Sequence, residues 1–317
     1  MLAAVPNWLA PALTREGQRL FWDHQAEDYD EASLTSNASE LALVRVLCDL
    51  FCEAEWAAQD LIALGCGTGS RDPETLLACL QVHGNLPLHV YLNDLSEHMV
   101  KRAVRRTTSD PRWGVCKARG YTGAAAEALR RCVTPRPRRV ILGVYRIESF
   151  VRAFPHYGHP RSGFDEYMEN SDRLGPYFQI NDMHLQGTEE RFLAEMRFVA
   201  DGDERRYDQI RDSIRSLPTL PGLDVTRVMS WAHHGDEAFF LSHWFTEAGI
   251  RRLIATQMGE EQEAKMSLVP CAKSFVICLD PPEEPRGIVT MLNNSFGNML
   301  PSDWSDTLAQ LKETCCL

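Results

Sequence analysis

Residues 60–69 read DLIALGCGTG, and this stretch decides the fold class of the chain. Its first five residues predict a short buried strand, because a brief apolar run that ends at a turn signal is typical of a parallel sheet. The three glycines that follow permit positive φ angles and let the backbone approach a ligand closely. We therefore expect a strand that leads directly into a ligand-binding turn.

A second signal lies further along, where residues 89–100 read HVYLNDLSEHMV. These residues predict another strand, which ends at the acid Asp94. A glycine turn after one strand and a carboxylate after the next are typical of a nucleoside site, because the acid accepts hydrogen bonds from two ribose hydroxyls. We expect an α/β protein with a doubly wound, mostly parallel sheet.

The glycine spacing separates two kinds of site. A dinucleotide fingerprint reads G-x-G-x-x-G, whereas residues 65–69 read G-x-G-x-G. Residues 64–69 (LGCGTG) and 92–99 (LNDLSEHM) resemble the first and second motifs of the class I S-adenosylmethionine-dependent methyltransferases. The resemblance implies a Rossmann-like sheet of seven strands and S-adenosylmethionine as cofactor. A doubly wound sheet that holds another nucleotide, or none, is the alternative.

The resemblance also implies which residues hold the cofactor. One position departs from the family pattern, because Ala63 stands where an acid often helps to hold the methionine end. A substitute could come from the N-terminal segment. Residues 118–122, just after the third strand expected at 113–117, would frame the adenine. The predicted cofactor-binding residues are Gly65, Cys66, Gly67, Thr68, Gly69, Asp94, Leu95, Ser96, Met99 and Tyr145.

Methyl transfer from a sulfonium requires mainly that the nucleophile is aligned with the methyl group and that water is excluded. A general base is needed only where the acceptor must lose a proton. A strand expected at 139–150 would place Tyr145 and Glu148 at the mouth of the site, since ligands of open α/β sheets lie at the carboxyl ends of the strands. Each candidate histidine also fits an ordinary surface or core position. The catalytic candidates are Glu148, Asp182, His184 and His243, with Tyr29 and Tyr145 as positioning groups.

The chain divides into three expected parts: a helical N-terminal cover (1–56), the methyltransferase-like α/β domain (57–282) and a C-terminal extension (283–317). Amphipathic periodicity predicts a helix over 37–52, and Pro73 opens another at 73–82. Further strands are expected at 176–184 and at 273–279, where the sheet would end, and an inserted hairpin at about 223–244.

Residues 293–301 (NNSFGNMLP) resemble the loop after the fourth strand of ergothioneine-type histidine methyltransferases. Their place near the end of the chain favours a chance match or an added capping element.

The composition argues against a nucleic-acid-binding, a metal-binding and a membrane-spanning protein. A chain of 317 residues fits one large domain with appendages, and its net charge of −11 argues against a nucleic-acid groove. The arginines at 130–139 are interpreted as a solvated loop. Ten cysteines without CxxC pairs, and histidines without ligand spacing, favour reduced thiols, a cytoplasmic location and no metal. No apolar run approaches the roughly 20 residues of a membrane span.

We expect a methyltransferase of secondary metabolism that acts on N, O or carbon of a small-molecule acceptor. The protein could form a homodimer. Low basicity and the missing Asn-Pro-Pro-Tyr motif favour an enclosed site over a nucleic-acid groove. A protein or peptide methyltransferase would instead show an open groove. A non-catalytic subunit with this fold would bind the cofactor weakly and need a partner.

Overall fold

The computed structural model describes residues 14–27, 29–30, 45–47, 49, 60–70, 87–114, 116–146, 177–181, 204–205, 208–209, 212, 225–234, 236–271, 274–292 and 294–317. The predicted helix at 73–82, most of the one at 37–52, and the catalytic candidates Glu148, Asp182 and His184 lie outside these residues.

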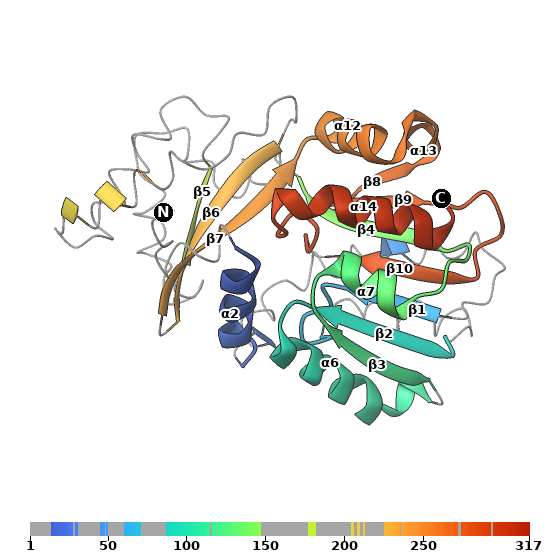
Figure 1. The fold of residues 1–317 in the computed structure, drawn as a ribbon, viewed down its shortest axis with the longest axis horizontal. Coiled ribbons are helices and arrows are strands. Elements are labelled where there is room, and N and C mark those ends of the chain that lie inside the picture. The colour runs from blue at the N-terminus through green and yellow to red at the C-terminus, as the bar shows by residue number, and fades with distance from the viewer. Residues whose placement is uncertain are drawn as a thin grey trace.

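Seven strands form one open, mostly parallel sheet, as the sequence predicts. Their order across the sheet is β3 (Lys117–Thr122), β2 (His89–Asp94), β1 (Asp60–Leu64), β10 (Gly287–Met291), β4 (Arg139–Tyr145), β9 (Ser274–Leu279) and β8 (Ser267–Cys271). The first five run parallel to their neighbours, whereas β9 is antiparallel to both β4 and β8. Helices cover both faces (Figure 1). The predicted doubly wound sheet is confirmed.

The alternation of side chains along β1 divides the core into two layers. Ile62 and Leu64 face one side, together with apolar residues of α7 (Ala125–Cys132), α12 (Glu247–Met258) and α14 (Pro301–Cys315). Leu61 and Ala63 face the other side, with Ala103 of α6 (Glu97–Ser109). A strand buried on both faces reads as a continuous apolar run, which explains why the pattern at 60–64 was informative.

Three of the described helices begin at a polar side chain that caps them. Thr14 caps α2 (Arg15–Gln25), Ser96 caps α6 and Thr246 caps α12, each accepting a hydrogen bond from a backbone N–H of the first turn. The short helix α13 (Glu260–Lys265) follows α12 and leads into β8. Among the described helices, none combines the length and apolar character that a membrane span requires.

A separate three-stranded antiparallel sheet stands beside the main one (Figure 1). It consists of β5 (Tyr177–Asn181), β6 (Val225–His234) and β7 (Asp236–Phe245). The hairpin predicted at 223–244 matches β6 and β7. The strand predicted at 176–184 is present, but its place in the main sheet was wrong: β5 pairs with β6 of the insertion.

Two further predictions about the main sheet need correction. The third strand is 117–122 rather than 113–117, because Trp113 belongs to a short 3₁₀ helix. The sheet also does not end at 273–279: β10, from the segment predicted as an extension, lies between β1 and β4 near the middle. All five residues of β10 are buried. An apolar run of this kind fits a central strand, but its pattern carries no information about its neighbours.

A buried ion-pair cluster fixes the C-terminal segment to the sheet. The carboxylate of Asp60, at the start of β1, accepts hydrogen bonds from Arg136 and from Arg138, which is 1% exposed. Arg138 also donates to the carbonyl oxygen of Thr314 at the end of α14. A Cβ atom on Gly287 would lie 1.9 Å from Asp60 Oδ1, so only glycine lets β10 pass beside this carboxylate.

Candidate active site

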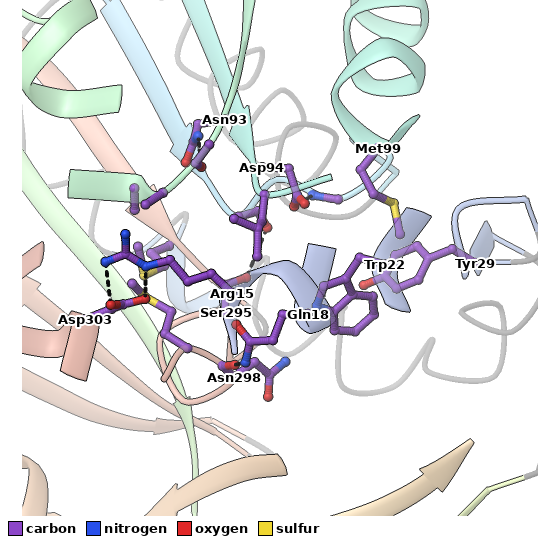
Figure 2. A pocket seen from close by; sticks show the side chains of 18 residues that line it. Arg15, Gln18, Trp22, Tyr29, Asn93, Asp94, Met99, Ser295, Asn298 and Asp303 are labelled. Carbon is purple, nitrogen blue, oxygen red and sulfur yellow. Dashed lines mark hydrogen bonds and ion pairs between the residues drawn. The ribbon is translucent and has the colours of Figure 1, made fainter. Parts of the chain in front are cut away.

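A pocket opens where four parallel strands end. Its walls come from the residues that follow β1, β2, β3 and β10, and α2 lies across it (Figure 2). Its empty volume, including the open mouth, is about 800 Å³. The lining residues are Arg15, Gln18, Trp22, Tyr29, Gly65, Gly67, Asn93, Asp94, Leu95, Met99, Gly123, Ala124, Ala125, Met291, Ser295, Asn298, Met299 and Asp303. This is the crevice in which open α/β sheets bind ligands.

The glycine turn depends on backbone angles that other residues rarely adopt. Gly65, Gly67 and Gly69 have φ values of 60°, 54° and 77°. A Cβ atom on Gly65 would lie 2.7 Å from the Cβ of Ser295, whose hydroxyl donates to the Gly65 carbonyl oxygen. A Cβ on Gly69 would lie 3.1 Å from the Cα of Ala103. The first glycine therefore brings the turn against the loop after β10, and the third brings it against α6.

Asp94 is held at the pocket by backbone N–H groups. Its Oδ2 accepts from Gly67 N at 3.0 Å and its Oδ1 from Ser96 N at 2.9 Å. Burial raises the pKa of this carboxyl to about 6; backbone hydrogen bonds oppose the rise, and the nearby Asp23 adds to it. An ionised carboxylate has about four lone-pair sites, so Asp94 keeps acceptor capacity for a ligand.

The slot beside Asp94 is lined by apolar side chains and bare backbone. Leu95 and Met99 line it together with the turn residues Gly123 and Ala124 and with Ala125 at the start of α7. The sequence assigned this framing role to residues 118–122, but they form β3 itself, and the turn comes after them. The side-chain amide of Asn93 donates to the carbonyl oxygens of Tyr121 and Gly123, which fixes the turn.

Helix α2 closes the pocket through polar contacts along its length. Arg15 forms a two-point ion pair with Asp303 at 2.9 and 2.6 Å. Gln18 is 5% exposed and donates from Nε2 to the carbonyl oxygen of Asn298, while its Oε1 accepts no hydrogen bond from the described residues. Asp23 accepts from the hydroxyl of Ser96 at 2.6 Å. The helix therefore reaches from the loop after β10 to the start of α6.

Two aromatic rings complete this cover. Trp22 and Tyr29 meet edge to face with ring centroids 6.1 Å apart, and both line the pocket. A Cβ on Gly67 would lie 3.4 Å from the Tyr29 ring. Tyr29 therefore lies over the middle glycine, on the same side of Asp94 as Met99 (Figure 2).

A hydrogen-bond chain fixes the orientation of Asn298. The Tyr145 N–H donates to Asn294 Oδ1 at 2.8 Å, so the other atom of that amide is the donor nitrogen. Asn294 Nδ2 donates to Ser242 Oγ and to Asn298 Oδ1, and Ser242 Oγ donates to the same Asn298 Oδ1. With Oδ1 occupied twice, Asn298 presents its Nδ2 as a free donor among the described residues. Because Asn298 lines the pocket, this donor is available to a ligand.

The predicted site residues fall into groups. Gly65, Gly67, Asp94, Leu95, Met99 and Tyr29 line the pocket. Cys66, Thr68, Gly69 and Ser96 lie behind it and support the turn and the start of α6: Cys66 N donates to the Asn93 carbonyl oxygen, and Thr68 donates to Asp30. Tyr145 and His243 lie under the loop after β10.

His243 is 1% exposed, its Nδ1 lies 2.8 Å from the Gly297 carbonyl oxygen, and its ring meets Trp304 edge to face. Tyr145 meets Trp244 in the same way. Neither is among the pocket-lining residues, so the structure gives both a part in holding the loop. No group of His, Cys, Asp and Glu suited to a metal occurs among the described residues.

The sequence patterns did not single out Gln18, Trp22, Asn298 or Met299, although all four line the pocket. The first two are on an amphipathic helix whose docking site only the fold reveals. The other two follow β10, whose place near the middle of the sheet was not predicted. The run NNSFGNMLP was the one local signal for them.

Comparisons with known proteins add to this description. No protein-family model and no curated protein matched the chain. Similar solved structures include CcbJ from Streptomyces caelestis, with 11% identity, TM-score 0.35 and coverage of 82% of this chain and 97% of that one. ChlM from Synechocystis PCC 6803, a magnesium protoporphyrin IX methyltransferase with S-adenosylhomocysteine bound, has 12% identity, TM-score 0.36 and coverage of 83% and 98%. DesVI from Streptomyces venezuelae has 13% identity and a TM-score of 0.32, with coverage of 81% of this chain and 98% of that one.

The described sheet, open and mostly parallel with seven strands, agrees with the fold that the two motifs predict. At identities of 11–13% and TM-scores of 0.32–0.36, the likeness to these solved structures is weak. Counted across the sheet from β3, the strand before residues 293–301 is the fourth.

Proposed function

We propose that this protein is an S-adenosylmethionine-dependent methyltransferase that acts on a small-molecule acceptor. The main observation in support is the pocket in which the glycine turn, the Asp94 carboxylate and the loop after β10 meet beneath α2. Two of the sequence motifs form one wall, and segments far away in the chain form the others.

The pocket residues fit this cofactor. Asp94 would accept hydrogen bonds from the ribose hydroxyls, and Leu95, Met99 and Ala124 provide apolar surface for the adenine. Gly65 and Gly67 line the pocket without side chains and so leave room for the methionine end. When bound, the cofactor supplies an activated methyl group on a sulfonium.

The covering helix would supply the contact that Ala63 cannot make. Gln18 carries the acceptor atom Oε1 and lines the same pocket as Gly65. A side-chain amide oxygen can accept from an ammonium group. The aromatic faces of Trp22 and Tyr29 can stabilise a positive charge at short range.

The acceptor would enter between α2 and the loop after β10. There Asn298 offers its N–H group to an acceptor oxygen or nitrogen, and Tyr29 is placed to position the acceptor. Closure by α2 excludes water, and alignment supplies most of the rate enhancement in a displacement of this kind. The covered pocket supports a small acceptor over a protein substrate, which would need an open groove.

Calorimetric titration of the full chain with S-adenosylmethionine, S-adenosylhomocysteine and NAD tests the proposal. We expect binding of the first two alone, and at least about tenfold weaker binding, roughly 1.4 kcal/mol, in Asp94→Ala. Asp110→Ala is the matched control, because Asp110 lies at the far end of α6 and is paired with Arg112. Equal binding by Asp94→Ala would refute the ribose assignment.

An acceptor screen follows, with release of S-adenosylhomocysteine as the readout. It includes histidine, because of the likeness of residues 293–301. Binding of the cofactor without turnover on any acceptor, and with a stable partner in pull-downs, would favour the non-catalytic subunit instead.

A further inference from the structure

A second cavity lies next to the active site and has no part in the proposed reaction. It lies between α7 and one face of β2 and β3, and its empty volume with the open mouth is about 660 Å³. The lining residues are Ile62, Tyr91, Leu92, Asn93, Arg119, Gly120, Tyr121, Ala128, Arg131, Cys132 and Val133. Asn93 lines both cavities and separates them.

The cavity exists because the two faces of this sheet edge are covered unequally. On one face α6 packs tightly, and a Cβ on Gly120 would lie 2.5 Å from the Val100 side chain. Among the described residues, the helix that covers the other face is α7, which has 8 residues. In the register of the pair, Tyr91 is opposite Arg119 and Asn93 is opposite Tyr121, so these side chains project on this same face. Figure 1 shows β2 and β3 extending beyond α7.

The charge of the cavity is opposite to that of the protein. The chain carries a net charge of −11, yet the ionisable side chains that line the cavity include two arginines and no carboxylate among the described residues. Arg119 forms no ion pair with any described residue, and Arg131 pairs with Glu127 while remaining 65% exposed. Burial raises the pKa of the Cys132 thiol, and Arg131 and Arg119 both act to lower it, which places both guanidinium charges near this sulfur.

Most of the remaining lining is aromatic or aliphatic. Tyr91 and Tyr121 are half-buried with their rings against the core, and Ile62, Ala128 and Val133 add aliphatic surface. Neither tyrosine hydroxyl has a hydrogen-bond partner among the described residues. A site that combines an apolar slot, two phenols, the unpaired Arg119 guanidinium and the largely exposed Arg131 guanidinium selects for a ring that bears an anionic group.

We propose that this cavity is a second binding site, for a small aromatic anion such as an aryl carboxylate or an aryl phosphate. Arg119 and Arg131 hold the anionic group, and the ring lies against Tyr91, Tyr121 and Ala128. The ligand is not the cofactor, because the wall at Asn93 separates this site from the glycine turn and Asp94. The proposal does not depend on methyl transfer.

The test uses the full chain and three probes: 4-hydroxyphenylacetate, phenyl phosphate and the uncharged 4-hydroxyphenylacetamide. Calorimetry is done with and without saturating S-adenosylhomocysteine. We expect affinities of about millimolar or better, which is reasonable for ligands of this size, for at least one anion and none for the amide. The carboxylate and phosphate probes identify the preferred anionic group. Displacement by S-adenosylhomocysteine would place the probe in the active site and overturn the proposal.

Arg119→Gln should weaken binding about tenfold, because it removes a charge-assisted hydrogen bond. The matched control is Arg130→Gln: Arg130 is also exposed and lies on α7, but it pairs with Asp306 and does not line the cavity. Equal losses in both variants would show a general charge effect, and no loss in Arg119→Gln would also refute the site.

Cys132 reports the position of the probe independently. It lines the cavity and is partly exposed, so its alkylation can be followed by mass spectrometry with the exposed Cys316 as reference. A bound anion should slow alkylation of Cys132 and leave that of Cys316 unchanged. Binding without protection of Cys132 would place the ligand elsewhere on the protein.

Discussion

The affinity for the cofactor should depend on pH through Asp94. Burial raises the pKa of this carboxyl to about 6, against its usual 3.8. The difference corresponds to about 3 kcal/mol that favours the protonated form in the ligand-free protein. Ribose hydroxyls that donate to the carboxylate favour the ionised form, so binding must remove the proton wherever it is present.

The direction of this pH dependence follows from the linkage between proton binding and ligand binding. At pH 8 Asp94 is already ionised, and binding releases no proton from it. At pH 5 only about a tenth of the molecules carry the ionised form if the pKa is about 6. The affinity for S-adenosylhomocysteine should therefore be about tenfold weaker at pH 5 than at pH 8, with proton release growing as the pH falls.

The same pKa predicts a cost to the ligand-free fold. Because the pKa of Asp94 is higher in the folded state than in the unfolded state, this carboxyl does not lower the free energy of unfolding below the unfolded pKa of about 4. The loss of stability grows as the pH rises. The full cost is present above about pH 6. Bound cofactor should recover part of it, so stabilisation by the ligand should be larger at pH 8 than at pH 5.

Calorimetry from pH 5 to 8, in pairs of buffers with different ionisation enthalpies, measures both the affinity and the protons released. Asp94→Asn should bind weakly at every pH and lose the dependence. Asp110→Asn should retain it, since that acid is distant from the pocket. An affinity of the unmodified protein that stays constant between pH 5 and 8, or a dependence that persists in Asp94→Asn, would refute the reasoning.

Three further outcomes follow from the packing. Asp60→Ala should lower the free energy of unfolding by about 3–5 kcal/mol in denaturant titrations, because it leaves the buried Arg138 guanidinium without its carboxylate; a loss under 1 kcal/mol would contradict this. Gly65→Ala should abolish calorimetric cofactor binding, since φ is 60° and the new Cβ would lie 2.7 Å from that of Ser295; normal binding would show that the turn relaxes. Asn298→Ala should weaken acceptor use about fivefold to tenfold by removing one hydrogen bond, with cofactor affinity retained; an equal loss of both would give Asn298 a structural part alone.

The sequence was informative where the signal was local. Residues 60–69 and 89–99 are each a strand joined to a turn or a helix cap. Their strands, β1 and β2, follow one another along the chain and are also neighbours in the sheet. The Ser96 cap and the Asp94 contact with the glycine turn both arise within such a unit. Local residue types and periodicity therefore determined the doubly wound class and the half of the pocket that contains Asp94.

The tertiary structure decided the other half. β10 is buried on both faces like β1, and an apolar strand carries no label for its neighbours because the hydrophobic effect is non-directional. Its place beside β1 is set by long-range contacts: Gly287 passes the Asp60 carboxylate, and Arg138 joins that carboxylate to the end of α14. That placement brings Ser295 and Asn298 to the glycine turn and gives α2 a surface to close against. The motifs in the sequence thus determined which fold forms and where Asp94 lies, whereas the far wall and the cover of the site follow from contacts between segments far apart in the chain.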